Sequence, residues 1–554
     1  TPFNCCKIGY GRVEMIDFTH EQKAAIDYPS SMVLTACPGS GKTAVIVEKI
    51  VRDLVECKEY QGVIAISYTN KASDELKKRC LKATPNSKSS FFGTIDKFYL
   101  TEVILPFIKQ LWGRVDDLHV VKLNELASSE KDRLSAFFNV EFICEKINEY
   151  DFKDIKELYA NGILILEFIP LLAFCILRNS LACRRYIAKK YTSIYIDEYQ
   201  DAGCVQHLLF LYLFELGVKA VAVGDADQSI YSYAGKSSKY LMSLLDEKSG
   251  FAPFKITINH RSHSSIVNYA SRLLNENCDL LITDQIRVYR KTVNGTQCEI
   301  AKWIDANINN IKRKFNISKE KEIAILTATN SSVALVSGLI NSKARAYLDD
   351  ELSVLGGDVS LLLKNLLNYR FNKTITAQAI IESLNYKVLE RNAIRKMRGV
   401  IRDVRDSNDN QLIPDLRKAV KLLINADISA NHIDAINSIL HNKMMLNNYL
   451  PVSDDELQIM TLHKAKGLEF DFVFHLDLYD WRLPRREYIK HCFDEVFSHY
   501  EQCLNLHYVG VTRAKKAVVL INSTERLNYQ SELKKAKPSQ FLSLKGLESL
   551  YKKI

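Results

Sequence analysis

The sequence predicts an α/β protein built from two lobes, each interrupted by a mainly helical insertion. Short apolar runs typical of buried strands alternate with amphipathic helices in two separate stretches of the 554-residue chain. This alternation is typical of parallel sheets that are covered by helices on both faces. A long segment with helical periodicity and almost no strand signal interrupts each stretch. The length is ample for several domains with cores of their own.

The first stretch pairs each buried strand with a following helix. The expected strands are Met32–Ala36, Gly62–Thr69, Ser193–Ile196 and Val218–Val223. The expected helices between and after them are Thr43–Leu54, Lys71–Leu81, Leu123–Phe138, Phe152–Tyr159 and Ile163–Leu177. The last three helices fall in the part that we interpret as an insertion.

The second stretch repeats this logic. The expected strands are Phe254–Ile258, Glu322–Leu326, Leu457–Leu462, Phe470–Leu476 and Val518–Ile521. The inserted helices are Val359–Tyr369, Ala377–Leu384, Leu416–Ala426 and Ile433–His441. We therefore expect a first lobe at 15–94 and 190–256 with its insertion at 95–189, and a second lobe at 257–344 and 453–554 with a short insertion at 345–452.

The composition excludes some classes of protein but does not indicate a function. The 75 Lys and Arg residues exceed the 65 Asp and Glu residues by 10, which permits a polyanionic partner but equally fits a solvated basic surface. The 13 cysteines have no CxxC or zinc-finger spacing, which predicts free thiols in a cytoplasmic protein. With 21 Gly and 11 Pro, a collagen-like or Pro-rich disordered chain is excluded.

Neither a membrane span nor a signal peptide is expected. The longest apolar candidate, Ile163–Leu177, is interrupted by Glu167 and Pro170 and is too short to cross a bilayer. The chain begins Thr-Pro-Phe, and its first methionine is Met15. We expect residues 1–14 to be a non-native or upstream extension and leave them out of the fold.

A phosphate-binding loop is the strongest chemical signal. The residues Cys37-Pro38-Gly39-Ser40-Gly41-Lys42-Thr43 lie between a strand and a helix, with Ala36 at the usual first glycine of GxxxxGK[ST]. Backbone N–H groups of such a loop and of the helix start cradle phosphate oxygens. Lys42 would reach the β- and γ-phosphates, and Thr43 would hold Mg²⁺. A glycine-rich turn without a ligand is the alternative.

A carboxylate pair follows the strand Ser193–Ile196. Asp197 would bind Mg²⁺ through water, and Glu198 would orient and deprotonate the attacking water. The alternative, an acidic helix N-cap, loses weight because a phosphate loop precedes the pair in the same stretch of alternating strands and helices. Gln228, after the next strand, carries an amide that can sense a γ-phosphate.

Two arginines supply the positive charge that phosphoryl transfer needs on the equatorial oxygens. Arg261 follows a strand that we place in the second lobe, and Arg513 lies in Tyr508-Val509-Gly510-Val511-Thr512-Arg513-Ala514. If both face the phosphate loop, hydrolysis depends on closure of the lobes. Taken singly, each arginine is more readily explained as a surface residue.

The order of these motifs resembles that of superfamily 1 helicases of the UvrD/Rep type, from about residue 17 to 525. Phe18–Gln22 is similar to the Q motif, Tyr68–Ala72 to motif Ia, Gly93–Phe98 to motif Ib and Met460–Phe470 to motif V. The resemblance implies two RecA-like P-loop NTPase lobes, 1A and 2A, with helical subdomains 1B and 2B. It also implies ATP and Mg²⁺ as cofactors and DNA-stimulated, 3′ to 5′ movement on single-stranded DNA or from DNA ends.

The resemblance also assigns roles to single residues. It implies that Gln22, His260 and Glu469 contact the nucleotide base or sugar, His260 standing where a tyrosine usually stacks on adenine. The implied DNA contacts are Tyr68, Asn70, Thr94, Tyr233 and His463. Two departures weaken DNA contacts: Ala234 replaces an arginine, and Asp96 replaces the usual histidine of motif Ib.

A narrower resemblance concerns the segments Phe91–Lys109 and Ser193–Asp201, which are similar to the helicase-like subunit of Gabija anti-phage systems. It implies a nuclease partner of the OLD family with a Toprim domain. A general DNA repair helicase stays open as an alternative, as does a regulatory ATPase that senses ATP and DNA ends with little unwinding. A small-molecule kinase using the same loop is disfavoured by the ordered motifs of the second lobe.

Overall fold

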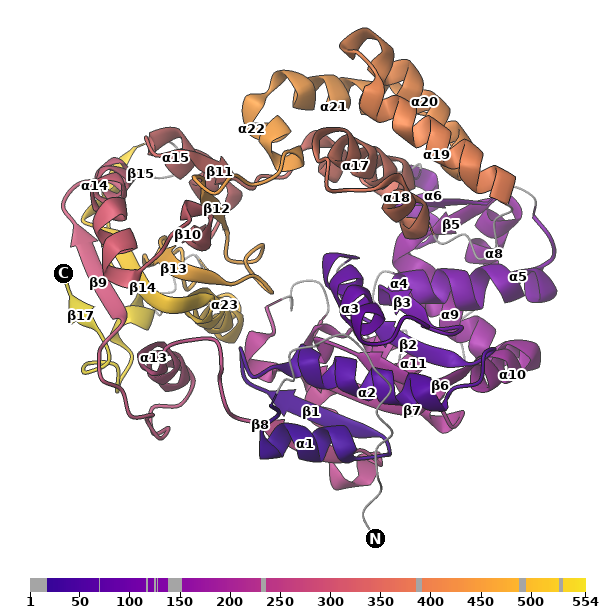
Figure 1. Cartoon of the computed structure of the whole chain (residues 1–554), viewed down its shortest axis with the longest axis horizontal. Helices are drawn as coiled ribbons and strands as arrows, with labels where there is room; N and C mark the ends of the chain where they lie inside the picture. Colours follow the sequence, from indigo (N-terminus) through magenta and orange to yellow (C-terminus); the bar gives the residue numbers. More distant parts are fainter. Residues whose placement is uncertain are drawn as a thin grey trace. The chain divides into compact units, whose positions relative to one another are not determined.

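The computed structural model describes residues 17–68, 70–115, 118–123, 126, 128–137, 152–230, 236–384, 391–487, 495–527 and 532–554 (Figure 1). The chain divides into two compact units. The first contains Thr1–Val115, Ala136–Lys156 and Phe168–His260, and the second contains Asp116–Ser135, Glu157–Glu167 and Arg261–Ile554. The extension expected at 1–14 lies outside the described residues. The four-subdomain boundaries stay a prediction.

The first unit is built on a six-stranded, fully parallel sheet with the order β3-β2-β6-β7-β1-β8. Its strands are β1 (Met32–Ala36), β2 (Gly62–Ile66), β3 (Phe91–Gly93), β6 (Tyr191–Ile196), β7 (Lys219–Gly224) and β8 (Ala252–Ile256). The central strands are buried almost throughout, as expected for a sheet covered on both faces. The predicted α/β class is therefore confirmed for this unit.

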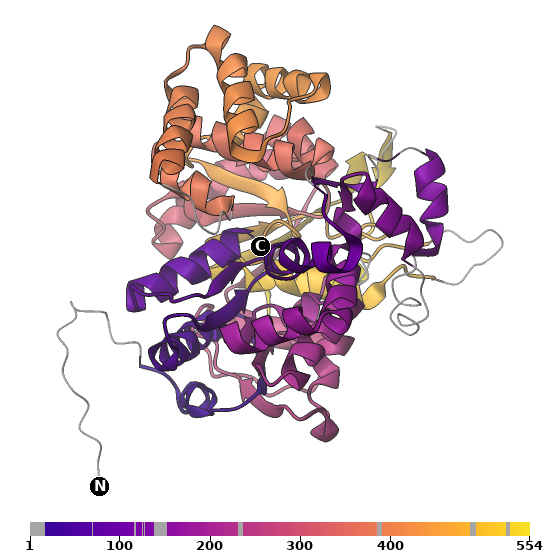
Figure 2. The ribbon, with the colours of Figure 1, turned by 90° about the vertical axis from the view of Figure 1, so that its right-hand side faces the viewer.

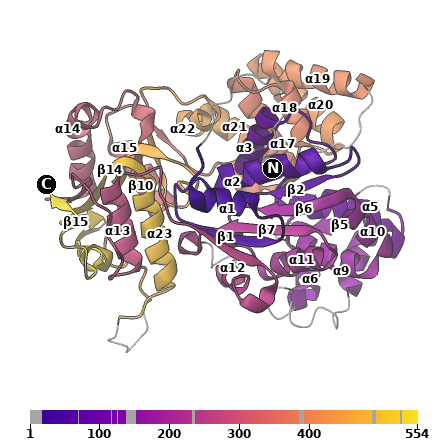
Figure 3. The ribbon, with the colours of Figure 1, turned by 60° about the horizontal axis from the view of Figure 1, so that its bottom comes forward.

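Helices cover both faces of this sheet (Figure 3). In Figure 3, α1 and α2 lie above the strands and α11 and α12 below them. The helices are α1 (His20–Asp27), α2 (Lys42–Glu56), α3 (Asn70–Ala83), α11 (Cys204–Glu215) and α12 (Lys239–Ser243). Apolar residues of α2, such as Ile46 and Ile50, pack with Leu34 and Val221 of the strands into one core.

One strand assignment was wrong. The strand expected at Phe254–Ile258 in the second lobe is β8, and it pairs in parallel with β1 at the edge of the first sheet. Sequence order placed it after the last strand of the first stretch, but pairing between strands far apart in the chain decides sheet membership. The consequence is functional, because the segment after β8 reaches the phosphate loop of the same unit: His260 N–H donates to the Gly39 carbonyl at 2.9 Å.

The second unit holds a seven-stranded parallel sheet with the order β11-β12-β10-β13-β14-β9-β17. Its strands are β9 (Val288–Val293), β10 (Ile323–Thr327), β11 (Ala344–Ala346), β12 (Leu457–Thr461), β13 (Phe470–His475), β14 (Ala514–Ser523) and β17 (Lys552–Lys553). The helices α14 (Gln297–Phe315) and α15 (Asn330–Leu339) lie along one side of the sheet, and α13 (Ser264–Leu274) and α23 (Tyr500–Thr512) along the other (Figure 1).

A helical bundle is inserted between β11 and β12, as the sequence predicts (Figure 2). Its helices are α16 (Glu351–Leu355), α17 (Gly357–Phe371), α18 (Ala377–Ser383), α19 (Arg391–Asp406), α20 (Asp409–Ile424), α21 (Ala430–His441) and α22 (Lys443–Leu446). Leucines and isoleucines at helical spacing, such as Leu363, Leu416 and Ile436, are fully buried and form a core of their own.

The segment between β3 and β6 is mainly helical but contains two short strands. Its helices are α4 (Ile95–Phe98), a π-helix at Tyr99–Ile104, α5 (Leu105–Trp112), α6 (Ser128–Arg133), α8 (Lys153–Ala160), α9 (Ile169–Asn179) and α10 (Leu181–Lys190). The helix expected at Ile163–Leu177 is wrong at its start, where β5 (Ile163–Ile165) pairs with β4 (His119–Val121). Pro170, in the first turn of α9, suits the helix start that follows.

Within the described residues, no single helix is long and apolar enough to cross a bilayer, whereas one helix pair bent by 99°, Leu166–Asn179 with Leu181–Lys190, has the required length and composition. A small antiparallel pair, β15 (Glu525–Leu527) and β16 (Leu533–Lys535), lies after β14.

Candidate functional site

The phosphate loop connects β1 to α2 with the backbone geometry that an anion site requires. Gly39 and Gly41 have φ angles of 70° and 79°, a left-handed region in which glycine is strongly favoured. A Cβ atom on Gly41 would lie 2.8 Å from the Gln22 amide nitrogen. Gly41 caps α2, so the free N–H groups and the positive dipole end of this helix are presented at the loop.

Gln22 supports this loop from the side. Its Nε2 atom donates to the Ser40 carbonyl at 2.9 Å, while its Oε1 atom accepts from the Thr19 N–H at 2.8 Å. Thr19 and Gln22 form a capping box at the start of α1, and the Gln22 side chain is buried. The structure thus ties the glutamine to the loop; its role as adenine reader stays a prediction.

The residue expected to stack on adenine lies beside the same loop. The His260 N–H bonds to Gly39, and the residue is exposed. The preceding Thr257 donates through its N–H and its hydroxyl to the Glu21 carboxylate, at 2.8 Å each. The Thr257–Glu21 bonds and the His260–Gly39 bond therefore fasten the end of β8 to both the Q motif and the phosphate loop; stacking of His260 on adenine stays a prediction.

The carboxylate pair stands at the end of β6. Glu198 has a φ angle of 57°, an uncommon left-handed conformation for a non-glycine residue, and its N–H donates to Asp197 Oδ1 at 2.9 Å. Burial, reinforced by the Glu198 carboxylate, raises the pKa of Asp197, and the Lys42 ammonium and the Thr43 hydroxyl oppose that rise. The loop after β1 and the pair after β6 therefore meet at one edge of the sheet.

This arrangement fits a magnesium ion. The hydroxyl of Thr43 is a hydrogen-bonding neighbour of the Asp197 carboxylate, and Mg²⁺ prefers one or two such oxygen ligands together with waters and substrate phosphates. A positive ion at this place would offset the burial and carboxylate repulsion that raise the pKa of Asp197. In the described part of the chain no group of three or more His, Cys, Asp or Glu residues forms a dedicated metal cage.

A buried chain of hydrogen bonds joins Glu198 to Gln228. Gln200 donates from Nε2 to Glu198 Oε2 at 2.5 Å and accepts at Oε1 from the Asp225 N–H at 2.9 Å. Asp225 Oδ2 in turn accepts from Gln228 Nε2 at 2.6 Å. A Cβ atom on Gly224 would approach Gln200 Oε1 to 2.5 Å, so glycine makes room for this link.

Sequence reasoning assigned no role to Gln200 or Asp225. Both lie inside the motifs that it quoted, Asp225 directly after β7 and Gln200 shortly after β6, and this position after a strand end was the available signal. Their function as a relay depends on side-chain directions that spacing alone does not give. The relay connects the expected catalytic base with the expected γ-phosphate sensor.

The two expected arginines belong to the second unit. Arg513, at the end of α23, is almost fully buried and donates from Nε to the Val509 carbonyl at 3.1 Å. Arg261 forms an ion pair with Glu469 at 2.6 Å. Burial works to raise the pKa of Glu469, but Arg261 and Lys515 hold it below its ordinary value. Approach of these arginines to the phosphate loop stays a prediction, as does the contact of Glu469 with the nucleotide sugar.

The expected DNA contacts are only partly described. Tyr233 lies outside the described residues, and nothing is described of the Asn70 side chain. Thr94 precedes α4 and is half-buried, and His463 follows β12, where burial and the nearby Lys466 lower its pKa. The Tyr68 hydroxyl is buried and has no hydrogen-bond partner among the described residues.

Lys236 is a cation that sequence reasoning missed. Its Nζ atom lies 4.9 Å from the centre of the Tyr68 ring. Its charge also opposes the burial that raises the pKa of Asp96. The residue joins the motif Ia and Ib regions and places a positive charge beside the aspartate that replaces the usual histidine. No local sequence pattern marked it, because the contacts come from segments far apart in the chain.

Two protein-family models match the chain. The UvrD-like helicase C-terminal domain matches residues 347–525, and an AAA domain matches residues 22–234. The second match contains the phosphate loop, the carboxylate pair and Gln228, and the first contains Glu469 and Arg513. The chain thus contains a UvrD-like helicase C-terminal domain and an AAA domain, and it is similar to superfamily 1 helicases of the UvrD/Rep type, which supports an ATP-dependent DNA helicase.

Individual relatives extend over nearly the whole chain. Gabija protein GajB from Bacillus cereus (strain VD045) is 28% identical over 529 residues, covering 91% of this chain and 96% of the relative. The ATP-dependent DNA helicase Rep from Buchnera aphidicola subsp. Baizongia pistaciae is 23% identical, with 95% and 94% covered. The Rep helicase from Salmonella typhimurium is 24% identical, with 94% and 93% covered.

Proposed function

We propose that this chain is a DNA-stimulated ATPase that translocates 3′ to 5′ on single-stranded DNA and acts as the helicase-like subunit of an anti-phage defence complex with a nuclease. The observation that carries the motor part is the meeting of the Asp197–Glu198 pair with Lys42 and Thr43 at one edge of the first sheet. These groups are the parts that phosphoryl transfer to water needs on one side of a triphosphate.

In this proposal each residue of the first unit has one task. Lys42 and the loop N–H groups bind the β- and γ-phosphates. Thr43 and Asp197 hold Mg²⁺, which neutralises charge developing on the phosphates. Glu198 accepts a proton from the attacking water, and Gln200 orients that carboxylate. Gln228 reports the state of the γ-phosphate through Asp225 and Gln200 to Glu198.

The second unit contributes positive charge to the same reaction. Arg261 and Arg513 stabilise the charge on the transferring phosphoryl group when the two lobes close. The ion pair between Arg261 and Glu469 keeps the guanidinium oriented until then. Hydrolysis thereby depends on closure, which is how ATP turnover is converted into steps along a strand.

For DNA, the proposal uses the motif Ia and Ib region of the first unit and His463 of the second. Thr94 contacts the strand, and Lys236 supplies the phosphate-binding charge that Asp96 cannot supply. The Lys236 ammonium, 4.9 Å from the centre of the Tyr68 ring, favours a second candidate function, a regulatory ATPase that senses DNA ends and unwinds little, because it occupies a ring face on which a base could stack.

The partner proposal rests on similarity. The relationship to Gabija protein GajB over most of both chains supports a place in a Gabija-type complex, with an OLD-family Toprim nuclease as partner. A cytoplasmic location is part of the same proposal. The free thiols of all nine described cysteines are compatible with it.

The decisive experiment measures ATP hydrolysis with and without single-stranded DNA and unwinding of a 3′-tailed duplex. We expect strong stimulation by DNA in the wild type. Glu198→Gln should bind ATP normally and lower turnover by about 1,000-fold. Full turnover in Glu198→Gln would remove Glu198 as the base, and stimulation without unwinding would select the regulatory ATPase.

Partner and strand binding are tested separately. Co-purification from native cells should recover a nuclease subunit, and its absence would favour a general repair helicase. Lys236→Gln should weaken binding of single-stranded DNA several-fold and lower the salt dependence of binding, with ATP binding unchanged. Lys239→Gln, which replaces a nearby exposed cation, is the matched control.

A further inference from the structure

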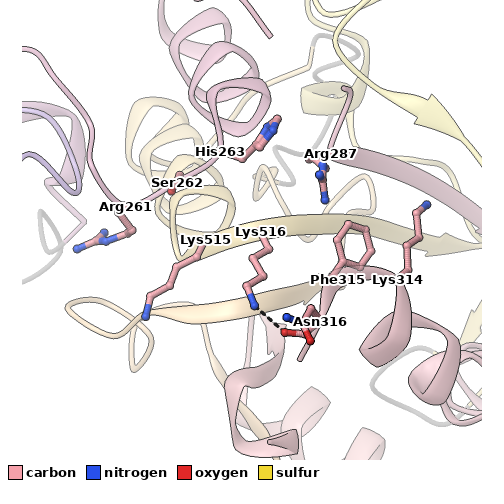
Figure 4. A pocket seen from close by; sticks show the side chains of 9 residues that line it. All are labelled: Arg261, Ser262, His263, Arg287, Lys314, Phe315, Asn316, Lys515 and Lys516. Atoms are coloured by element: carbon pink, nitrogen blue, oxygen red, sulfur yellow. Dashed lines mark hydrogen bonds between the residues drawn. The ribbon is translucent and has the colours of Figure 1, made fainter. Parts of the chain in front are cut away.

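A basic pocket lies in the second unit at the start of its sheet (Figure 4). It encloses about 430 Å³. Its walls come from the segment before α13, the residue before β9, the C-terminal end of α14 and the start of β14. The lining residues are Arg261, Ser262, His263, Arg287, Lys314, Phe315, Asn316, Lys515 and Lys516.

The charge of this pocket is strongly one-sided. Five of the nine lining residues carry a permanent positive charge, a sixth is a histidine, and none of the described lining residues is acidic. Carboxylates outside the lining set neutralise part of this charge. Glu469 pairs with Arg261 at 2.6 Å and with Lys515 at 3.5 Å, Asp471 pairs with Lys516 at 2.7 Å, and Asp284 lies 3.3 Å from His263.

Two of the cations have no carboxylate partner among the described residues, Arg287 and Lys314. The Arg287 guanidinium lies 5.3 Å from the centre of the Phe315 ring, and its buried Nε atom makes no hydrogen bond within the described structure. The Lys314 ammonium also lies 5.3 Å from that ring and bonds to the Tyr289 hydroxyl at 3.2 Å. Aromatic contacts hold both cations in place without neutralising them.

We propose that this pocket binds a phosphate-bearing small molecule, either inorganic or part of a nucleotide. Neighbouring cations without counter-ions, such as Arg287 and Lys314, repel one another, and a bound anion removes that repulsion. A guanidinium fork and several ammonium groups together match a phosphate, which offers several acceptor oxygens. A pocket of about 430 Å³ holds one phosphorylated molecule.

A neighbouring cavity distinguishes the two sources of phosphate. It encloses about 160 Å³, shares Lys314 and Phe315 with the basic pocket, and is lined by the aromatic side chains of Tyr289, Trp303 and Phe472. Asn307 and Asn310 add amide groups to this wall. The flat ring of a nucleobase, with its polar edges, suits such a cavity. A nucleoside monophosphate should therefore bind more tightly than inorganic pyrophosphate.

The pocket is independent of the proposed hydrolysis. Arg261 is the single lining residue to which we give a part in ATP turnover; Arg287, Lys314 and Lys516 have none. Because the phosphate loop lies in the first unit, Lys42→Ala removes its phosphate affinity and leaves the basic pocket intact. Binding to the pocket is therefore measurable whether or not the proposed function is correct.

The test is equilibrium dialysis of the full chain carrying Lys42→Ala, with radiolabelled pyrophosphate and, separately, adenosine monophosphate. We expect one molecule bound per chain. Adding Lys314→Gln and Lys516→Gln should weaken binding of both probes by about tenfold. Adding Lys302→Gln instead, which replaces an exposed cation on the same helix α14, should change nothing, and thermal melting checks that each variant is folded.

Three results would overturn the proposal. Loss of all pyrophosphate binding in Lys42→Ala would assign it to the phosphate loop. Binding that is indifferent to Lys314→Gln and Lys516→Gln in folded protein would remove the pocket as its site. Displacement of pyrophosphate by a short DNA strand without terminal phosphates, at equal phosphate concentration, would assign the cations to a strand backbone rather than to a small molecule.

Discussion

The two parallel sheets use opposite edges for their chemistry. In the first unit the phosphate loop, Asp197 and the Gln228 loop each follow the carboxyl end of a strand. In the second unit Glu469, Arg513 and Arg287 each precede the amino end of a strand, β13, β14 and β9. Carboxylates and amides dominate the first edge, and cations the second. In the proposed function, two sheets of similar construction divide the work, the first binding metal and activating water and the second supplying positive charge.

The difference shows that a functional site in a parallel sheet need not lie at the carboxyl ends of the strands. Carboxyl ends of parallel strands are the usual place for ligands, as the first unit illustrates. The second unit instead secures the segment of Arg261 at the start of β14, where Ser262 Oγ donates to the Ala514 carbonyl at 2.7 Å and the His263 N–H donates to the Lys515 carbonyl at 2.8 Å.

The largest effect is expected from a substitution at the carboxyl edge of the first sheet. Lys42→Ala removes the ammonium that we propose binds the β- and γ-phosphates, so DNA-stimulated ATP hydrolysis should fall by about 1,000-fold. ATP affinity should fall with it, as measured by fluorescent-nucleotide titration. Lys58→Ala, an exposed lysine of the same unit, should behave as wild type. Retained hydrolysis in Lys42→Ala would end the assignment of the phosphate loop.

The next largest effect distinguishes the proposed role of the second sheet from that of the first. Arg261→Gln should lower turnover by about 100-fold while ATP affinity changes little, because this cation acts on the transition state rather than on the bound nucleotide. Rapid-quench and binding measurements separate the two quantities. An equal loss of ATP affinity would mean that the cations hold the ground state, and the division of work between the units would be wrong.

A smaller effect tests the relay of the first unit. Gln200→Ala removes one hydrogen bond to the Glu198 carboxylate and one from the Asp225 N–H, which should lower turnover by about tenfold. The KM for ATP should change less than kcat. Gln206→Ala, a glutamine at the start of α11, is the control; an equal effect there would show that the loss reflects stability and not positioning.

The smallest effect concerns acid stability of the second unit. His507 donates from Nδ1 to His475 Nε2 at 3.0 Å, since His475 Nδ1 bonds to the Leu476 carbonyl. Burial lowers the pKa of His475 from 6.5 to about 4 and that of His507 well below 6.5. The unfolded chain therefore binds protons that the folded unit does not, and stability present above pH 6.5 is lost as the pH falls towards 4.

From His475 alone this loss amounts to about 2 kcal/mol at pH 5 relative to neutral pH. Urea unfolding at the two pH values measures it. His475→Gln should reduce the pH dependence by about that amount, whatever its effect at neutral pH, and His441→Gln at an exposed site should not. In the first unit the raised pKa of Asp197 has the opposite sign, because that carboxylate favours the folded unit less as the pH rises.

Much of the fold and of the first edge could be predicted because the signals are local. The strands β1, β2, β6 and β7 appear as apolar runs, and the chemistry directly follows each of them. Parallel pairing then brings those strand ends together. The same logic failed for β8, whose partner β1 is more than two hundred residues away, and at Ile163–Ile165, where pairing with β4 overrides a helical pattern.

Residues that matter through contacts with distant parts of the chain could not be predicted from the sequence. Lys236 lies over the Tyr68 ring, and Gln200 reaches both Glu198 and Asp225. The basic pocket gathers four segments spread from Arg261 to Lys516. None of these groupings has a spacing or a period in the chain, so no local pattern reveals them.

The sequence by itself determined the phosphate loop, the order of the motifs and the alternation of strands and helices, since each depends on neighbours along the chain. Only the tertiary structure decided which sheet takes β8, which side chains link Glu198 to Gln228, and where unneutralised cations gather. These depend on side-chain directions and on pairing between distant segments, which burial and hydrogen bonding select after the local elements have formed.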